Sequence, residues 1–370
     1  MNERPHTAAV LDRNSATPIP DGEMRAAVYR GKNEIFLEMV PVPEIGEGEL
    51  LVRVHSCGVC GTDIKKIEHG LVEPPRIFGH EMAGTVVRAG KKAKKFAEGD
   101  RVALHHHIPC RKCFYCRKKL FSQCASYRRT GTTAGFEPAG GGFAQYVRVM
   151  DWIVAEGTVG IPEGVSFEEA SFLEPLNTCL KALETAGLER GEVVAILGQG
   201  PVGLLLMQAA ECEGAIVAGL DLMDSRLEVS RKLGAHLVLN PDLHDVKSEL
   251  AKITEGRGAD LAIVATADSR AIAAAQGLVR RGGRALLFAQ TVPGEMASVD
   301  ASQICVEEKK LLGSYSASVE LQEKAAHLIF SRKVRVAELV SHRFTLDRLL
   351  EAVYLASHPS RDSLKVMIQP

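Results

Sequence analysis

Long apolar runs are missing from this sequence, which argues against membrane-spanning helices. A spanning helix needs about 18 consecutive apolar residues, and no stretch approaches that length. The N-terminus also lacks the apolar core of a signal peptide. Neither sign of charge is in excess, since 45 basic residues balance 46 acidic ones, so no overall field attracts nucleic acid or an anionic membrane. We therefore expect a cytoplasmic protein with a small-molecule partner.

The nine cysteines do not indicate disulfides. Their number is odd, and the clustered ones stand at spacings typical of metal ligands in a chain without an export signal. We expect reduced thiolates that bind zinc.

The 370 residues, 46% of them apolar, are sufficient for two cores, so we expect two domains. Between about 25 and 165, short stretches of alternating polarity, the last at 152–157, are separated by glycine and proline turns. They predict an antiparallel, barrel-like β domain. From about 190, apolar runs alternate with helical patterns, as in a parallel sheet of βαβ units. Near 315 the chain is expected to return to the first domain.

These patterns also give the expected boundaries. Residues 1–23 have no apolar periodicity and predict a disordered extension. Ser166 and Glu169 form a capping box that starts one helix over 166–187, the expected hinge and cleft floor. The first domain is expected at 24–175 and 316–370, and the second at 176–315.

Residues 57–81 bring together ligand types that suit zinc. CGVCGTD is followed about twenty residues later by GHE, so Cys60, His80 and Glu81 supply a thiolate, an imidazole and a carboxylate. Taken singly, a cysteine is more often a small buried side chain and a histidine a hydrogen-bonded one. Together, with Asp63 to hold a ligand from behind, they predict a catalytic zinc site with one open position.

Four cysteines at C-x2-C-x2-C-x7-C spacing predict a second, structural zinc site. They are Cys110, Cys113, Cys116 and Cys124. Residues 111–129 hold seven basic residues and no acidic one, which conflicts with four merely buried cysteines. Small basic zinc modules often bind nucleic acid, but no recognition-helix pattern adjoins this one. We expect a solvated surface, or one that faces an acidic patch of another subunit.

Three adjacent histidines, His105, His106 and His107, follow a predicted strand. Side chains on a strand alternate between faces, so three neighbours cannot easily reach one metal ion. We expect them to be strand residues.

Gly198, Gly200 and Gly203 form GQGPVG between a predicted strand and a predicted helix, the context of a dinucleotide-binding loop. The glycines allow a tight turn, close approach of a pyrophosphate, and packing of helix on strand. Pro201 and Val202 begin the helix, whose N-terminus offers unpaired N–H groups to phosphate.

The next strand ends at Asp221. A carboxylate at this distance accepts hydrogen bonds from the ribose of NAD and repels the 2′-phosphate of NADP. Alternatively, Asp221 only caps the following helix. We expect NAD, with NADP less favoured.

CGVCGTD with GHE resembles the signature of the zinc-dependent medium-chain dehydrogenase/reductase family, the alcohol and polyol dehydrogenases, and the resemblance extends over nearly the whole chain from Met24. It implies an α/β protein with a GroES-like antiparallel β-barrel catalytic domain and a Rossmann coenzyme domain built on a doubly wound parallel sheet. It implies two zinc ions per chain and a homodimer or homotetramer. The implied activity is NAD-linked interconversion of a secondary alcohol, such as a polyol, sugar or amino alcohol, and its ketone.

The resemblance also assigns residues. Classical alcohol dehydrogenases have a cysteine where this chain has Glu174, as in the sorbitol and threonine dehydrogenase-like branch, so Glu81 and Glu174 are alternative zinc partners. Thr62 would relay the alcohol proton, but Lys65 replaces the histidine that ends the relay in many relatives. Further cofactor contacts fall on Thr178, Arg226, Ala265 and Gln290, and Ser314 and Tyr315 are expected to line the cleft.

The substrate stays open, with sugar phosphates and simple alcohols as alternatives. A zinc-free, quinone reductase-like protein is disfavoured because Cys60, His80 and Glu174 are all present. A metal- and nucleotide-binding sensor without catalysis is the other alternative, and a turnover assay with NAD and a polyol panel distinguishes it.

Deletion of residues 1–23 tests the expected extension. Without apolar periodicity this segment has nothing to pack, so the truncated chain should keep its melting temperature and its oligomeric state. A loss of several degrees in thermal unfolding would show that the segment docks on the folded chain.

Overall fold

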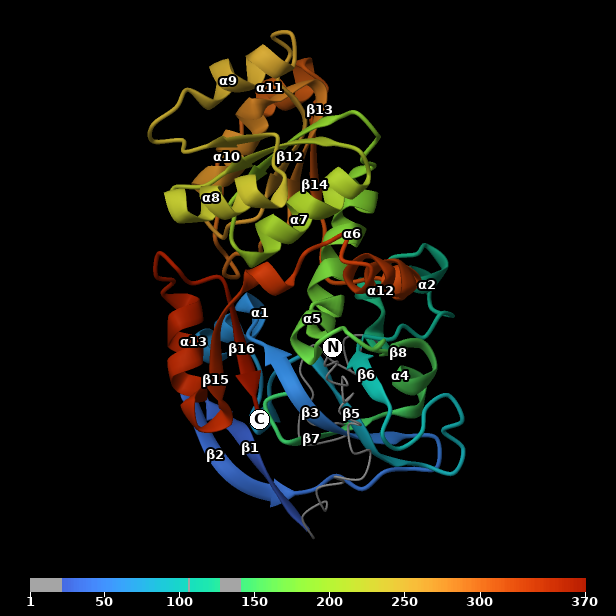
Figure 1. The fold of residues 1–370 in the computed structure, drawn as a ribbon. Helices are drawn as coiled ribbons and strands as arrows, with labels where there is room; N and C mark the ends of the chain where they lie inside the picture. The colour runs from blue at the N-terminus through green and yellow to red at the C-terminus, as the bar shows by residue number, and fades with distance from the viewer. Residues whose placement is uncertain (1–21, 106, 127–140) are drawn as a thin grey trace, which may run out of the picture.

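The computed structural model describes residues 22–105, 107–126 and 141–370, so most of the predicted extension at 1–23 lies outside it. One half of the chain is built on mainly antiparallel strands and the other on a parallel sheet covered by helices (Figure 1). This confirms the predicted α/β class. In these ranges no helix is long and apolar enough to cross a membrane.

The first half contains two sheets. The smaller has the order β2-β1-β4, and the larger has the order β15-β16-β3-β5-β6-β8 with β7 paired to β3. The smaller consists of β1 (Glu23–Gly31), β2 (Glu34–Pro41) and β4 (Arg76–Ile77). The larger consists of β3 (Leu50–Gly58), β5 (Glu81–Ala89), β6 (Arg101–Leu104), β7 (Tyr146–Val149), β8 (Thr158–Gly160), β15 (Val340–Thr345) and β16 (Lys365–Gln369). Segments from both ends of the chain therefore share one sheet.

Residues 152–157 do not form the predicted strand. They lie mostly in α4 (Asp151–Glu156), which leads into β8. Ile153 and Val154 are both buried, and neighbours that share a face fit a helix rather than a strand. The apolar, β-branched residues alone suggested a strand, whereas Asp151 in the first turn favours a helix N-terminus.

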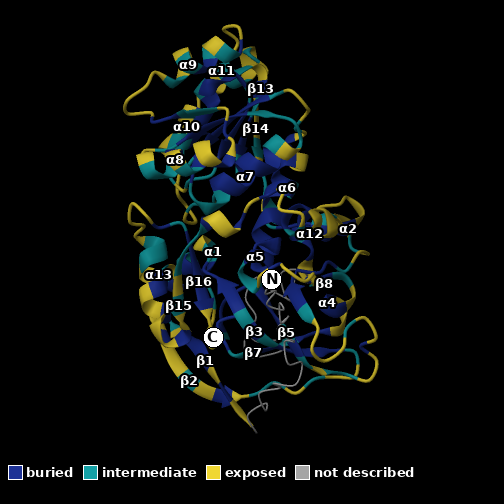
Figure 2. Ribbon diagram, in the orientation of Figure 1, coloured by how far each residue is buried: buried dark blue, intermediate teal, exposed yellow. Residues whose placement is uncertain are grey.

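The second half is a parallel sheet with the order β11-β10-β9-β12-β13-β14. Its strands are β9 (Val193–Leu197), β10 (Ile216–Leu220), β11 (Leu237–Leu239), β12 (Ala259–Val264), β13 (Val279–Leu287) and β14 (Lys310–Gly313). Helices lie on the sheet, namely α7 (Pro201–Cys212), α8 (Asp224–Leu233), α9 (Val246–Ile253), α10 (Arg270–Leu278) and α11 (Ala301–Val306). The central strand β9 is buried throughout, as its uninterrupted apolar sequence predicts, and Figure 2 shows the sheet interior as buried.

The segment between the halves forms two helices rather than the predicted one. The capping box of Ser166 and Glu169 is present and starts α5 (Phe167–Ser171). A second helix, α6 (Leu173–Ala186), begins after Phe172. Pro175 explains the break, because proline lacks an N–H and its ring clashes with the carbonyl four residues earlier in a continuous helix.

Helix α6 lies between the two halves and belongs to a core that they share (Figure 1). This core joins Leu176 of α6 to Leu204 of α7 and to Met367 of β16. Asn177, fully buried, donates to Ser318 O at 2.9 Å and accepts from Ser318 N at 2.9 Å. The described residues also form the α-helices α1 (Gly61–His69), α2 (Phe114–Arg117), α12 (Gln322–Phe330) and α13 (Leu349–Ser357).

Candidate active site

Antiparallel pairing of β3 with β5 brings the predicted catalytic metal ligands together. Gly58 at the end of β3 lies opposite Glu81 at the start of β5. Cys60 follows β3 and His80 precedes β5, so the two ligands meet at this end of the sheet. One ligand atom from each of Cys60, His80 and Glu81 lies within 4.8 Å of the others. A thiolate, an imidazole and a carboxylate at this separation fit a zinc ion with an open fourth position.

Gly79 lets the chain pass close to Phe143 and Cys57 directly before His80. Its φ is +92°, and a Cβ atom there would lie 2.7 Å from a ring carbon of Phe143 and 2.8 Å from Cys57 Sγ. Both the backbone angle and the contacts exclude a larger residue without rearrangement. Steric contact thus explains why a glycine precedes His80 in GHE.

Asp63 holds His80 from behind. Its Oδ1 lies 3.1 Å from His80 Nδ1, and both side chains are buried. A hydrogen bond at Nδ1 fixes the tautomer and leaves Nε2 as the metal-binding nitrogen. The sequence predicts that Asp63 supports a metal ligand in this way.

Glu81 makes an ion pair with Lys365 of β16, and both side chains are buried. Lys365 Nζ also donates to Val59 O at 3.0 Å. Burial opposes the charge on Lys365, but the nearby Glu81 outweighs it and raises the pKa of this lysine. Lys365 was not predicted from the sequence, although a lysine at the start of the mainly apolar strand KVMIQ is a usable signal.

Glu174 reaches the same region from α6. Its Oε1 lies 4.0 Å from His107 Nδ1, and burial raises the pKa of Glu174 to about 7. His105 is also close, because ligand atoms of His105, His107 and Glu174 lie within 4.8 Å of one another. The prediction that these histidines are strand residues is wrong for His105 and His107, since β6 ends at Leu104. His106 lies outside the described residues.

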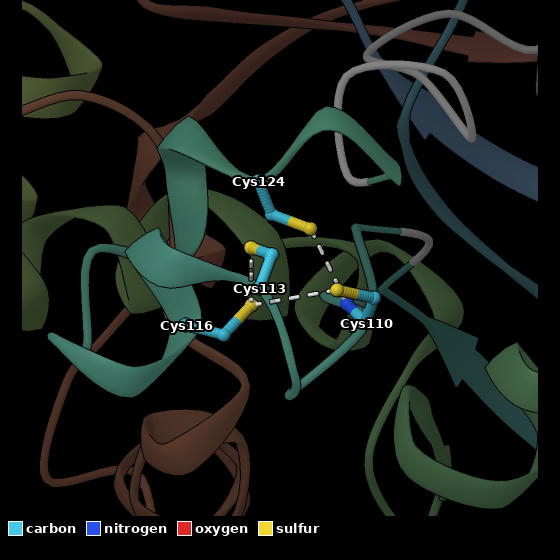
Figure 3. Close-up of side chains that lie close together, drawn as sticks. All are labelled: Cys110, Cys113, Cys116 and Cys124. Atoms are coloured by element: carbon cyan, nitrogen blue, oxygen red, sulfur yellow. Dashed lines mark hydrogen bonds between the residues drawn. The ribbon is translucent and has the colours of Figure 1, made fainter.

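The four cysteines of the predicted structural zinc site converge, as Figure 3 shows, and we call residues 110–124 the zinc lobe. Cys116 Sγ lies 3.5 Å from Cys113 Sγ and 4.0 Å from Cys110 Sγ, and Cys110 N donates to Cys124 Sγ at 3.4 Å. Four sulfurs about 2.3 Å from a tetrahedral zinc are about 3.8 Å apart, so this set fits a closed structural zinc.

The basic residues of the lobe are partly paired within the chain. Arg111 forms an ion pair with Glu156, and Lys119 Nζ lies 3.2 Å from Glu320 Oε2. These partners lie in α4 and near α12, so the lobe contacts two other parts of the fold. Arg128 and Arg129, also counted in the basic run, lie outside the described residues.

The glycine-rich loop connects β9 to α7 in the geometry that dinucleotide binding requires. Gly198 has φ +100°, and a Cβ atom at Gly203 would lie 1.9 Å from Gly198 O. At Gly200 the nearest atom to an added Cβ is Arg226 Nη1 at 3.8 Å, so space is open above the loop. Pro201 occupies the first turn of α7.

Asp221 follows β10 and faces this loop. It accepts hydrogen bonds from Gln199 N at 2.7 Å and from Met223 N at 2.9 Å, and Arg226 Nη1 lies 3.8 Å away. Met223 itself is the N-cap residue of α8. Asp221 therefore contacts the phosphate loop as well as the start of the next helix.

A single cavity of about 600 Å³ joins the metal ligands to the nucleotide-binding half. From the first half it is lined by Cys60, Thr62, Lys65, His80 and Glu81. From α6 and the second half it is lined by Glu174, Thr178, Val202, Ala265, Gln290, Ser314 and Tyr315. The predicted metal ligands, the residues expected near the nicotinamide and the residues expected to line the cleft thus face one space, whereas Asp221, Arg226 and the glycines of the loop are not among its lining residues.

Fold and site together define a zinc-binding dehydrogenase, and comparison with known proteins agrees. The family models for the alcohol dehydrogenase GroES-like domain and for zinc-binding dehydrogenase match residues 46–161 and 201–331. Sorbitol dehydrogenase of Bacillus subtilis (strain 168) is 31% identical over 354 residues, which are 94% of this chain and 97% of that protein. Sorbitol dehydrogenase of Bos taurus is 30% identical over 94% of this chain and 96% of its own length.

Solved structures show the same similarity. A protein of Sinorhizobium meliloti 1021 named as a zinc-binding dehydrogenase and bound to NADP has a TM-score of 0.84 at 27% identity, covering 94% of this chain and 99% of that one. The chain therefore belongs to the zinc-dependent medium-chain alcohol dehydrogenase family, in its sorbitol dehydrogenase-like branch.

Mild chelation should separate the two kinds of zinc site. Four thiolates enclose one ion, whereas the site at Cys60 and His80 keeps an exchangeable position, so its zinc should leave at a lower chelator concentration. Metal analysis should find one zinc per chain after mild treatment, both in the wild type and in Cys60→Ala. Loss of all zinc at one chelator concentration would contradict the assignment.

Proposed function

We propose that this protein is a zinc-dependent, NAD-linked oxidoreductase that interconverts a secondary alcohol and its ketone, with polyols as the favoured substrate class. One observation carries the proposal: a single cavity is lined by the metal ligands on one side and by the nucleotide-binding half on the other. The sorbitol dehydrogenases of Bacillus subtilis and Bos taurus support the choice of polyols.

Each group of residues has its own role in this proposal. When bound, zinc supplies a Lewis acid for the alcohol oxygen, and the nicotinamide supplies the hydride acceptor. Cys60 and His80 hold the zinc, with Glu81 or Glu174 as the third protein ligand. Asp63 orients His80, and the cavity walls from both halves limit the access of water.

The alcohol proton leaves through Thr62 in this proposal. The Thr62 hydroxyl belongs to the first turn of α1, two residues after Cys60, and lines the cavity. Lys65 lies one turn further along α1 and also lines the cavity. Desolvation lowers the pKa of Lys65, but an ammonium group remains a poor proton acceptor near neutral pH. We therefore place Thr62, and not Lys65, in the essential step.

The cofactor is bound by the glycine-rich loop, with Asp221 and Arg226 on the adenosine side and Thr178, Ala265 and Gln290 near the nicotinamide. We propose NAD as the preferred cofactor because the Asp221 carboxylate faces the loop and repels a 2′-phosphate. We further propose two zinc ions, one at Cys60 and His80 and one in the four-cysteine lobe, and a homodimer or homotetramer, which sedimentation can test.

A turnover assay with NAD and a panel of polyols, sugars and amino alcohols tests the function directly. Growth of NADH absorbance with at least one polyol, lost in His80→Ala while NADH still binds, is the expected result. NADH binding without turnover of any alcohol would favour a sensor.

Replacing Thr62 and Lys65 separately tests the proton path. Thr62→Val should keep its zinc and lower kcat by roughly 10²- to 10⁴-fold, the usual contribution of a positioned proton-transfer group. Thr62→Ser should restore most of the rate, because it keeps the hydroxyl. Lys65→Ala should have a much smaller effect, and an inactive Lys65→Ala beside a fully active Thr62→Val would overturn the path.

Cofactor preference should depend on Asp221. Loss of a charge-assisted hydrogen bond of about 1.5–3 kcal/mol corresponds to roughly 10- to 150-fold in binding. Asp221→Ala should therefore lower the ratio of kcat/KM with NAD to kcat/KM with NADP by a factor in that range. Asp242→Ala, an exposed aspartate of the same half, is the control. An unchanged ratio in Asp221→Ala would refute the role.

A further inference from the structure

A second set of metal-ligand types lies beside the Cys60 site. His105 and His107 follow β6, and Glu174 comes from α6. One ligand atom from each of the three lies within 4.8 Å of the others. The exposed fractions of the three residues are 0%, 2% and 5%, so the cluster lies in the interior of the protein and not on its surface.

Among these three residues, His105 is the one whose burial is not explained by a role in packing alone. It is fully buried, and among the described residues neither ring nitrogen makes a hydrogen bond of good geometry, although the backbone of His107 is close enough to act on the ring. A buried imidazole in that state loses its bonds to water without replacement. A metal ion between the two histidines and the carboxylate would supply the missing partner, and two histidines with one carboxylate are a common ligand set for zinc.

The geometry also allows an ion here and an ion at Cys60 and His80 together. The rings of His80 and His107 have centroids 6.4 Å apart, so the two ligand sets are neighbours. Metal ions in paired sites are about 3.5–4 Å apart and often share a carboxylate. Glu174 has two oxygens, and one of them already points toward His107 at 4.0 Å. His107 lines the cavity, which gives an ion a path from solvent.

We propose that His105, His107 and Glu174 form a second divalent-metal site, suited to zinc, directly beside the catalytic one. This site is not part of the proposed function. It depends on that function in one respect, because Glu174 is also a candidate ligand of the catalytic zinc. His105 and His107 supply two of the ligands from the segment that follows β6, and Glu174 of α6 supplies the third.

Metal content tests the proposal in the full-length protein. Wild-type protein equilibrated with zinc sulfate and then desalted should hold three zinc ions per chain, which is one more than the two ions of the proposed function. His105→Leu and His107→Gln should each hold two, whereas His55→Leu, a change at a histidine elsewhere in the first half, should hold three. Equal zinc content in the wild type, His105→Leu and His107→Gln would overturn the site and leave the histidines as hydrogen-bonding neighbours of Glu174.

Anomalous diffraction at the zinc edge separates this outcome from failure of the proposed function. A peak between His105, His107 and Glu174 in the wild type, absent in His107→Gln, supports the second site whether or not a peak lies at Cys60 and His80. Absence of that peak in zinc-equilibrated wild-type crystals overturns it. This measurement decides the matter even if His105→Leu does not fold.

Discussion

The pairing of β3 with β5 and with β16 is the constraint on which the metal site depends. On one side β5 places Glu81 opposite Gly58. On the other side β16 runs antiparallel to β3, Val59 N donates to Val366 O at 2.9 Å, and Lys365 Nζ donates to Val59 O. The residue before Cys60 is thus fixed from both its N–H and its carbonyl. A metal site fixed by sheet hydrogen bonds keeps its geometry better than one held only by loops.

Helix α6 is the second fixed element, because it serves both halves. Glu174 and Thr178 are four residues apart, so they project from the same face of the helix, and both line the cavity. Glu174 lies 4.0 Å from His107, and Thr178 lines the cavity one turn further along the helix. The helix is also buried in the shared core and bonded to Ser318 through Asn177. Their spacing across the cavity is therefore set by a single rigid helix.

The features whose residues are close in sequence could be predicted. The four cysteines, the glycine-rich loop and the capping box at Ser166 each lie within one short segment, so spacing alone carries the signal. Features with a distant partner or an ambiguous pattern could not be predicted in this way. Lys365 meets Glu81 only because β16 returns to β3, and apolar β-branched residues at 152–157 fit a helix as well as a strand. Pro175 was a readable sign of the break before α6.

The two carboxylates at the site differ in what balances their charge. Glu81 has the buried ammonium of Lys365 as a permanent partner. Glu174 forms no ion pair with a lysine or arginine in the described part of the chain and faces His107 instead. Burial raises the pKa of Glu174 to about 7, so near neutral pH it is ionised only in part unless a cation is close. A bound metal ion would lower that pKa and keep the carboxylate charged. Glu174 is thus the carboxylate whose charge depends on what occupies the cavity, whereas Glu81 has its counter-charge, Lys365, within the fold.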